Sequence, residues 1–329
     1  MDKIRWGIVG PGTIANKFAQ AIKNVEGAEL AAVASRREET GREFARKYDI
    51  PKVFVGYEEM AGSDAVDAVY IATPHPFHKP CAELFLKAKK HVLCEKPICI
   101  NAAQAVRLSE CAKENGVFLM EAMWTRFLPA IKEACAIVQR GEIGEVLGVN
   151  ADFCYASTPQ EEAKLFQNEM AGGSLLDVGV YGLHFAAMFL GNKPKSICAA
   201  AQVEEGVDCH TNVLMKYESG AMACISSAIN LYKPESAYIY GTKGYLYLPQ
   251  FYGATDIFLN IGGQEQHIVK PGMGDGFEEE ICEACTCIRA GRTESDILPL
   301  SESIEILKQM DEIRKQIGVK YPFEGEECS

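Results

Sequence analysis

The stretch IRWGIVGPGTIA (residues 4–15) joins an apolar run to a glycine turn and then to the start of an amphipathic segment. Gly10, Gly12 and Ala15 fit the pattern G-x-G-x-x-G/A at such a strand–turn–helix junction. Gly10 permits the tight turn, Gly12 lets the backbone approach a pyrophosphate, and Ala15 allows close packing of the helix. Thr13 and Ile14 open the helix whose N-terminus would hold the phosphates. We therefore predict a dinucleotide-binding turn; the alternative is a glycine turn without a ligand.

The chain beyond this turn continues to alternate apolar runs with helical segments. Helical patterns cover 13–25 and 101–116, the second between an N-cap candidate at Asn101 and a terminal Gly116. Such alternation is typical of βαβ units around a parallel sheet. Residues 1–123 are predicted to form a Rossmann domain with a doubly wound parallel sheet. The further strand candidates lie at 29–35, 65–73, 91–95 and 117–122.

The pattern changes in the second part of the chain, residues 124–329. Turns at 219–220, 242–244 and 262–263 join neighbouring strand-like runs, as in antiparallel hairpins. A helical tail at 301–318 has one apolar stripe. We predict an α+β domain with an open, mainly antiparallel sheet, which binds substrate and forms the dimer. Its strand-like runs lie at 144–156, 196–205, 211–231, 236–249 and 256–270.

Composition limits the classes of partner. The 329 residues carry a net charge of −12, so we expect no nucleic-acid partner, and no apolar run looks long enough to span a bilayer. Thirteen scattered cysteines are typical of a reducing compartment, so we expect a cytoplasmic protein. Cys282, Cys285 and Cys287 cluster on a helical segment without further ligands for a metal, so we interpret them as core residues and expect no metal.

The end of the second strand bears on the choice of dinucleotide. An acidic residue commonly meets the ribose hydroxyl about twenty residues after the glycines. This strand ends instead in Ser35-Arg36-Arg37. A hydroxyl and two guanidinium groups suit a 2′-phosphate, so NADP is favoured over NAD. The alternative is that Arg36 and Arg37 lie beside Glu38 and Glu39 at a solvated helix start.

Two later strands end in polar residues at the same edge of the sheet, where ligands bind in open α/β folds. One is followed by Thr73-Pro74-His75-Pro76-Phe77-His78 and the other ends in Glu95-Lys96-Pro97. Pro97 keeps Lys96 out of the helical region. Lys96 is therefore predicted to hydrogen-bond a substrate hydroxyl beside the nicotinamide, and burial would lower its pKa. A surface Glu–Lys pair is the alternative.

One helix in the second part carries polar groups on an apolar background. After Gly172-Gly173, the run SLLDVGVYGLHFAAMFLG is predicted to be a single helix, with Asp177, Tyr181 and His184 on one stripe. A hydroxylated substrate would satisfy these groups. An internal polar network is the alternative, and His184 alone fits a core histidine equally well.

Taken together, the glycine turn, ATPHPFH (72–78), CEKP (94–97) and GGSLLDVGVYGLH (172–184) resemble the glucose–fructose oxidoreductase/inositol dehydrogenase (Gfo/Idh/MocA) family. The segments EAMWTRFLP (121–129) and 298–318 are similar to its branch of dimeric dihydrodiol dehydrogenases and NADP-dependent xylose dehydrogenases. The resemblance implies that Lys96 is catalytic, with a Lys96–Pro97 peptide that is often cis. It also implies that Tyr181, at a position where many members have histidine, exchanges the proton. His75 stands where Asn is common.

Further candidates come from the residues after the last parallel strand. Trp124 and Phe127 are placed to wall a pocket for a ring-shaped substrate, and Arg126 to reach a phosphate or substrate oxygen. Packing at the domain junction is an equal alternative. The residues at the ends of the two later strands are also predicted to contact the cofactor: Thr73, Pro74, His75, His78, Glu95 and Lys96.

The predicted function is an NADP(H)-dependent oxidoreductase that transfers hydride between nicotinamide and a hydroxyl-bearing carbon of a sugar, cyclic polyol or dihydrodiol. Tyr181 exchanges the proton, Lys96 bonds the same oxygen and Asp177 orients a neighbouring hydroxyl. A non-catalytic dinucleotide sensor and an NAD(P)-dependent glycosidic hydrolase are the alternatives. Tyrosines 238, 240, 245 and 247 on one sheet face predict a homodimer or a higher homo-oligomer formed through this sheet.

Overall fold

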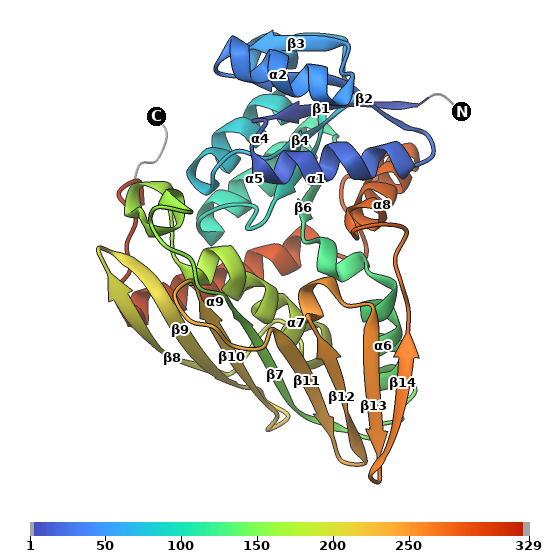
Figure 1. The fold of residues 1–329 in the computed structure, drawn as a ribbon, viewed down its shortest axis with the longest axis vertical. Helices are drawn as coiled ribbons and strands as arrows, with labels where there is room; N and C mark the ends of the chain where they lie inside the picture. Colours follow the sequence, from blue (N-terminus) through green and yellow to red (C-terminus); the bar gives the residue numbers. More distant parts are fainter. Residues whose placement is uncertain (1–2, 325–329) are drawn as a thin grey trace. The chain divides into compact units, whose positions relative to one another are not determined.

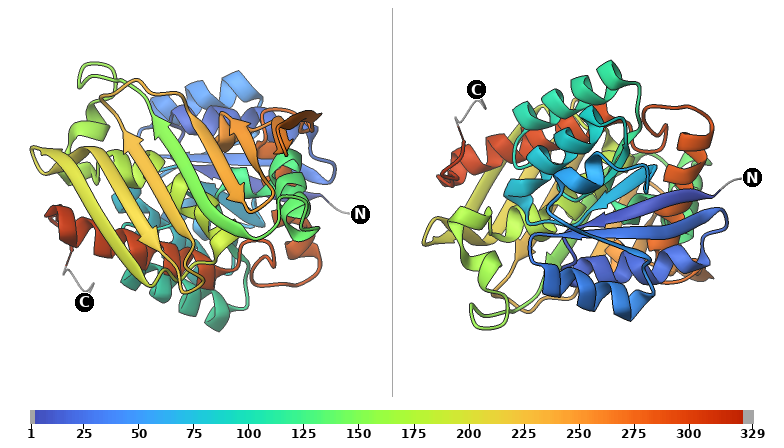
Figure 2. Two further views of the ribbon diagram at one scale, coloured as in Figure 1. Left: turned by 90° about the horizontal axis from the view of Figure 1, so that it is seen from below. Right: turned by 90° about the horizontal axis from the view of Figure 1, so that it is seen from above.

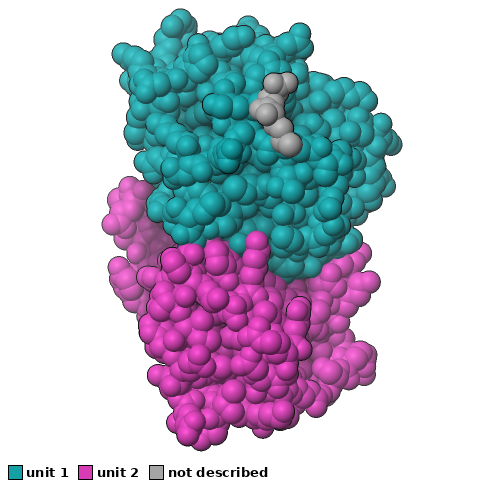
Figure 3. Space-filling model, turned by 90° about the vertical axis from the view of Figure 1, so that its right-hand side faces the viewer, with its two compact units in different colours: residues 1–127, 272–304 teal, residues 128–271, 305–329 magenta. Residues whose placement is uncertain are grey.

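The computed structural model describes residues 3–324, which form two compact units (Figure 3). Unit 1 comprises Met1–Phe127 and Gly272–Ile304, and unit 2 comprises Leu128–Pro271 and Glu305–Ser329. The sequence-based division after residue 123 treated each domain as one continuous stretch, whereas 272–304 returns to unit 1. The reason is packing: helix α8 (Phe277–Arg289) lies against α1 (Thr13–Ala21) and buries Phe277 and Ile281.

Unit 1 is built on a six-stranded sheet in the order β3-β2-β1-β4-β5-β6, in which every pairing is parallel (Figure 1). Figure 2 shows α1 and α2 (Glu38–Tyr48) on one face, with α4 (His78–Lys87) and α5 (Ala102–Asn115) on the other. The predicted doubly wound sheet is confirmed. The strand order reverses between β1 and β4, which sets the ligand crevice at the carboxyl ends of these strands. The strands are β1 (Ile4–Val9), β2 (Ala28–Ser35), β3 (Lys52–Val55), β4 (Ala68–Ile71), β5 (His91–Glu95) and β6 (Leu119–Ala122).

Local signals account for these elements. All four residues of β4 are buried, as are Val92, Leu93 and Cys94 in β5, which explains why β4 and the centre of β5 are apolar. Helix α5 begins where the Asn101 side chain accepts a hydrogen bond from the Gln104 amide. It ends at Gly116, whose φ of +64° is left-handed. Both predicted helix ends are confirmed.

Unit 2 contains an eight-stranded sheet in the order β14-β13-β12-β11-β7-β10-β9-β8. Its pairings are antiparallel except that β7 runs parallel to β10. The predicted mainly antiparallel sheet is therefore confirmed. The strands are β7 (Val146–Cys154), β8 (Ser196–Glu204), β9 (Val207–Lys216), β10 (Met222–Ala228), β11 (Ser236–Gly241), β12 (Gly244–Pro249), β13 (Asp256–Ile261) and β14 (Gln264–Val269).

Helices cover one face of this sheet, and its strands lie in front of them when the molecule is seen from below (Figure 2, left). These helices are α6 (Pro129–Gln139), α7 (Val180–Leu190) and the part of α9 (Leu300–Ile317) that belongs to unit 2. Leu307, Met310 and Ile313 of α9 are buried, as its apolar stripe predicted. Gln316 ties α9 to β8 by bonding the Ala199 amide and the Ile197 carbonyl.

The opposite face of the sheet carries the four predicted tyrosines. Tyr238 stacks on Tyr240 with ring centroids 5.6 Å apart and on Tyr247 at 4.6 Å, and Tyr245 lies beside both of the first two. The alternate residues Ile239 and Leu246 are fully buried against the helices. The period of two along β11 and β12 thus separates an apolar core face from an aromatic outer face.

The segment Asn168–Leu190 is long and apolar enough, by length and composition, to cross a membrane. The sequence-based expectation that no apolar run is long enough to span a bilayer was therefore wrong for this segment. In the structure 72% of its apolar window is buried within the protein. This burial is the usual situation of a core helix, which passes the same test of composition.

Candidate active site

The glycine turn lies at the carboxyl end of β1. Gly10 has φ +84°, and a Cβ at this position would stand 3.0 Å from the Thr73 methyl carbon. Gly12 is the N-cap of α1 and offers no side chain, so the first amides of the helix remain available to a ligand. Main-chain amides at a helix N-terminus, approached over two glycines, fit a dinucleotide pyrophosphate.

The end of β2 provides the groups predicted to hold a 2′-phosphate. Ser35 is buried and its hydroxyl accepts a hydrogen bond from the Arg37 amide at 3.2 Å. The Arg36 guanidinium lies over the Phe77 ring, 5.5 Å from its centroid. Glu38 is paired with Arg42 at 2.6 Å and is thus directed along the helix α2. These contacts fit NADP, because arginine at this strand tip can meet a phosphate.

Lys96 follows directly on the buried strand β5. Glu95 is 6% exposed, and its carboxylate accepts hydrogen bonds from the Tyr70 hydroxyl and, at 3.2 Å, from the Lys96 amide. The Lys96–Pro97 peptide is cis, as the family resemblance implied. Glu95 therefore holds the main chain at Lys96, and Tyr70 is the partner that the sequence did not reveal.

His78 lies between the ends of β4 and β5. Its Nδ1 is 2.8 Å from the Pro97 carbonyl oxygen and its Nε2 is 2.7 Å from that of Thr73. The ring is 1% exposed, burial lowers the pKa of His78, and the His75 ring packs edge-on at 5.7 Å. The neutral imidazole carries one N–H, so His78 donates a hydrogen bond to one of these two carbonyls and lies buried between the two loops.

A second buried carboxylate supports the chain just past Lys96. Glu121, on β6, is 1% exposed and accepts hydrogen bonds from the Ile98 amide at 3.0 Å and from the Ser303 hydroxyl at 2.5 Å. Ser303 is 182 residues further along the chain. Sequence reasoning did not identify this contact, because nothing local links the two residues.

The residues after β6 make contacts within unit 1. The Arg126 guanidinium pairs with Glu302 at 2.8 Å and donates to the Ile297 carbonyl at 2.9 Å. Phe127 is fully buried. Trp124 stacks on Phe277 of α8 at 5.3 Å. Arg126 and Phe127 therefore pack within unit 1, and Trp124 stacks on a buried ring, Phe277, that sequence reasoning did not identify.

In unit 2, the predicted single helix starts differently from expectation. Leu175–Gly179 form a π-helical turn, and α7 follows from Val180. The turn is anchored by Asp208, whose carboxylate accepts from the Ser174 hydroxyl, the Leu175 amide and the Thr211 hydroxyl at 2.7–2.8 Å. Burial raises the pKa of Asp208. At Gly173, φ +112°, a Cβ would clash with this carboxylate at 2.2 Å.

Asp177 and Tyr181 lie at the junction of the π turn and α7. The Asp177 carboxylate accepts a hydrogen bond from the Tyr155 hydroxyl at 2.9 Å. Tyr181 is 7% exposed, and its ring lies 5.3 Å from Phe153 and 6.2 Å from Tyr252. Phe153 and Tyr252 stack at 4.1 Å. Sequence reasoning missed these aromatic neighbours; the alternation of Phe153 and Tyr155 at a strand end was the available signal.

The remaining predicted residue, His184, is buried in α7 at 1% exposure. Within residues 3–324, no group of three or more His, Cys, Asp or Glu side chains is placed to hold a metal ion. Cys285 and Cys287 are buried on α8, and Cys282 is half-buried.

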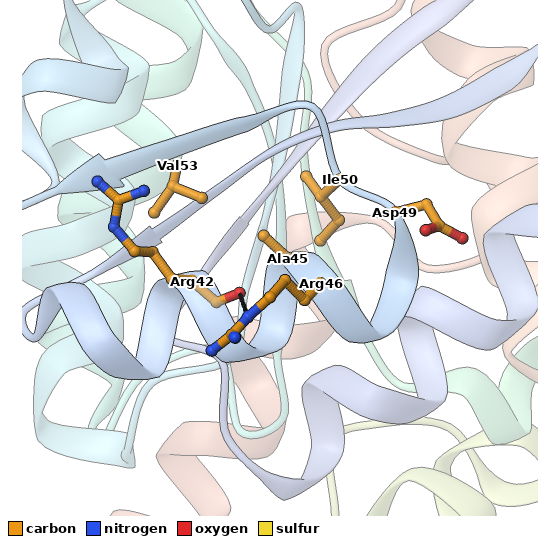
Figure 4. Close-up of a pocket in the computed structure, with 6 residues that line it drawn as sticks. All are labelled: Arg42, Ala45, Arg46, Asp49, Ile50 and Val53. Carbon is orange, nitrogen blue, oxygen red and sulfur yellow. Dashed lines mark hydrogen bonds between the residues drawn. The ribbon is translucent and has the colours of Figure 1, made fainter.

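A cavity of about 540 Å³ lies apart from these residues, between α2 and β3 (Figure 4). It sits beside the amino end of β3, whereas the glycine turn is at the carboxyl ends of the strands. It is therefore not part of the candidate site. Its lining residues are Arg42, Ala45, Arg46, Asp49, Ile50 and Val53.

Comparison with protein families matches both units. Residues 4–123 match the family model described as an oxidoreductase family with an NAD-binding Rossmann fold, and residues 131–247 match the GFO/IDH/MocA C-terminal domain. Trans-1,2-dihydrobenzene-1,2-diol dehydrogenase of Mus musculus is 37% identical, over 97% of this chain and 98% of that protein. The Homo sapiens protein of the same name is 35% identical over the same shares.

Solved structures give the same fold. A 3-ketoreductase from Actinomadura kijaniata, in complex with NADP and TDP-benzene, has a TM-score of 0.87 at 26% identity, covering 96% of this chain and 98% of its own. An aldose-aldose oxidoreductase from Caulobacter crescentus, complexed with glycerol, also has a TM-score of 0.87, at 25% identity and with 95% and 97% covered. A levoglucosan dehydrogenase at 17% identity shares the fold, with a TM-score of 0.88 and 96% and 98% covered.

Proposed function

This chain belongs to the Gfo/Idh/MocA family of oxidoreductases, and we propose that it is an NADP(H)-dependent dehydrogenase or reductase acting on the CH–OH group of a sugar, cyclic polyol or dihydrodiol. The observation that carries the proposal is made in each unit by itself: unit 1 fixes a lysine directly after β5, and unit 2 fixes an aspartate and a tyrosine at the start of α7. Relatives that are about 35% identical carry the name of dihydrodiol dehydrogenases, which supports the polyhydroxylated class of substrate.

The cofactor half of the proposal concerns residues of unit 1. The amides after Gly12 hold the pyrophosphate, while Ser35, Arg36 and Arg37 hold the 2′-phosphate. When bound, the nicotinamide supplies or accepts the hydride. Glu95 and His78 do not need to touch the cofactor: they fix the main chain at Lys96 and Thr73, which border its crevice.

The substrate half assigns one role to each polar residue. Tyr181 exchanges the proton of the reacting hydroxyl, and Lys96 donates a hydrogen bond to the same oxygen. Asp177 accepts a hydrogen bond from a neighbouring hydroxyl and so orients the substrate. Phe153 and Tyr252, stacked beside Tyr181, provide an apolar wall that suits the face of a ring. Positioned acid–base groups of this kind typically contribute about 10²–10⁴ in rate.

Two other functions remain distinct in their chemistry. A dinucleotide sensor on this fold would bind NADP without turnover and has no use for a proton-exchanging tyrosine. A glycosidic hydrolase would use the dinucleotide without net consumption and would release a leaving group. Retention of both Lys96 and Tyr181 favours the oxidoreductase.

The test is a spectrophotometric screen. Purified protein is mixed with NADPH and a panel of carbonyl sugars, and with NADP⁺ and a panel of sugars, polyols and aromatic dihydrodiols, while NADPH absorbance is followed. The proposal expects turnover with at least one compound that carries adjacent hydroxyls, lost in Lys96→Ala. Cofactor binding with no absorbance change would support the sensor. Release of a leaving group without net NADPH change would support the hydrolase.

The outer face of the eight-stranded sheet suggests how the protein assembles. Its tyrosines are joined by Leu214 and Met222, exposed by 46% and 49%, on neighbouring strands. An apolar, aromatic face of this extent supports a homodimer formed through it. Light scattering at micromolar concentration should give twice the chain mass, and Tyr240→Asp should give the monomer. Val55→Asp, at an exposed apolar residue of unit 1, is the control; a monomeric native protein would refute the assembly.

The cellular compartment is likewise a proposal. All twelve cysteines in the described part of the chain are free thiols, and most are buried. This usage supports a cytoplasmic, reducing environment. Fractionation of the native cells, followed by an immunoblot, tests it.

A further inference from the structure

Tyr155 lies directly after β7, and its hydroxyl faces two carboxylates. The oxygen is 2.9 Å from Asp177 Oδ2 and 3.3 Å from Glu162 Oε2. Asp177 stands on the π turn that leads into α7, and Glu162 lies in the loop between β7 and that turn. No family motif pointed to Tyr155, since its position follows from a contact across 22 residues.

The protonation of this group follows from its surroundings. Burial raises the pKa of Tyr155, and the charges of Asp177 and Glu162 raise it further. The phenol therefore keeps its proton at any working pH, and an ionised carboxylate can only accept. A single O–H cannot serve both acceptors fully. The shorter contact, to Asp177, takes the hydrogen bond.

The ring itself is held by the sheet. The Tyr155 amide donates to the Ala228 carbonyl at 3.1 Å, and Ala156 forms a bridge with Asn230. The side chain packs with Leu165 and Phe166 of the following loop against the buried cluster of Val207, Cys209 and Ile229. The hydroxyl is thus presented from a position that the strands fix, rather than from a free loop.

We propose that Tyr155 is a positioning residue that holds the Asp177 carboxylate in the orientation needed to accept a hydrogen bond from the substrate hydroxyl next to the reacting carbon. The inference rests on the proposed function, in which Asp177 orients that hydroxyl. The Tyr155 hydroxyl donates to Oδ2 of Asp177 and so fixes the plane of this carboxylate. Asp177 stands four residues before Tyr181. Its effect should therefore depend on the substrate: large for vicinal diols, small for substrates without the neighbouring hydroxyl.

The experiment compares Tyr155→Phe, Glu162→Gln and Asp177→Asn. Removing a hydrogen bond to a charged group commonly lowers an equilibrium constant by roughly 10–100-fold. Tyr155→Phe should therefore lower kcat/KM for a vicinal diol by about that factor. NADPH affinity should stay unchanged. The acid limb of its pH profile should move to higher pH, because a carboxylate that has lost a donor is protonated more readily. Glu162→Gln, which alters only the longer contact, should change kcat/KM by less than about twofold.

A double-mutant cycle identifies the route of the effect. If Tyr155 acts through Asp177, then Tyr155→Phe/Asp177→Asn is no slower than Asp177→Asn alone. Tyr217→Phe, at a buried tyrosine whose hydroxyl contacts Met215, is the control for removing a phenol oxygen. Unfolding midpoints are measured for every variant, and rates are compared at a temperature where all are folded.

The outcomes separate the two levels of the argument. Normal turnover in Asp177→Asn would remove the proposed role of Asp177 and with it this inference. An impaired Asp177→Asn beside a normal Tyr155→Phe would overturn the role of Tyr155 alone. Equal losses in Tyr155→Phe and Glu162→Gln, or additive losses in the double mutant, would assign Tyr155 to loop anchoring instead.

Discussion

The chain at Lys96 and the chain at Tyr181 are fixed by different physical means. After β5, the main chain is held by groups close in sequence or on adjacent parallel strands: Glu95 accepts from the Lys96 amide, and His78 bridges Thr73 and Pro97. Before α7, the π turn is held by side chains of distant strands, above all by Asp208 of β9. Each arrangement satisfies buried polar groups, but the first spreads the contacts over several side chains, whereas in the second one carboxylate accepts from two hydroxyls and one main-chain amide.

This difference predicts how each region responds to mutation. A strand with a buried apolar centre, such as Val92–Cys94 of β5, should keep its position when one side chain beyond its end is changed. The start of α7 depends on one carboxylate with three donors, so the loss of that residue leaves several buried groups unsatisfied. A change at Lys96 should therefore lower the catalytic rate without lowering the stability of the fold. A change at Asp208 should mainly lower the stability.

The largest expected effect tests the first half of the comparison. Lys96→Ala should lower kcat by about 10²–10⁴, because it removes a positioned donor, with little change in NADPH affinity or unfolding midpoint. Tyr181→Phe should lower kcat by a similar factor, because it removes the proton-exchanging hydroxyl. Absorbance assays of NADPH turnover measure kcat, and fluorescence titration measures NADPH affinity. Full turnover in Lys96→Ala would contradict the catalytic assignment, and a large fall in stability would contradict the comparison.

The next effect tests the second half. Asp208→Ala should lower the free energy of unfolding by about 3 kcal/mol, since the Ser174 hydroxyl, the Leu175 amide and the Thr211 hydroxyl lose one shared acceptor. Urea denaturation of the two proteins gives this value. Asp208→Asn, which keeps an oxygen acceptor, is the matched control and should lose less. A stable Asp208→Ala with normal turnover would mean that the π turn does not depend on this residue.

The same contrast explains what could be predicted from the sequence. The glycine turn, the capped helix α5 and the hairpins of unit 2 are encoded by neighbouring residues, and all were predicted. Lys96 was proposed as a site residue because Pro97 and the apolar run of β5 lie beside it. Tyr181 was proposed from a stripe on one helix and from the family resemblance.

The missed features depend on contacts between distant residues. Ser303 meets Glu121 across 182 residues, and Tyr155 meets Asp177 across 22. The π turn was predicted as α-helix because its apolar pattern does not record the wider spacing, and its contacts with Asp208 join residues 33 or 34 positions apart. The return of α8 to unit 1 was hidden for the same reason: its apolar face shows that it packs, but not against which element.

A smaller effect concerns the cofactor rather than the framework. Arg36→Ala should weaken NADPH binding by about 10–100-fold, the usual range for a charge-assisted bond to phosphate, and leave NADH binding nearly unchanged. Fluorescence titration with both nucleotides measures the ratio. Arg107→Ala, at an exposed arginine of α5, is the control. An equal loss for NADPH and NADH would remove Arg36 from the 2′-phosphate site and restore the alternative of a solvated helix start.

The smallest expected effect concerns a buried glutamate of unit 1. Glu280, on α8, is fully buried, and burial, with the charges of Glu95 and Glu279, raises its pKa well above the usual range. The native protein therefore keeps a proton that the unfolded chain releases above about pH 4.3, so stability falls as pH rises above that value. A glutamine cannot ionise and removes this loss.

Glu280→Gln should accordingly be more stable than the native protein at pH 8, by about 1 kcal/mol or more, and close to it at pH 4, because each unit of raised pKa corresponds to about 1.4 kcal/mol. Urea denaturation at both pH values measures the difference. Glu43→Gln, at an exposed glutamate of α2, should show no such dependence. A Glu280→Gln protein that is less stable than the native protein at pH 8 would mean that Glu280 is ionised and bound by a partner, and would contradict the raised pKa.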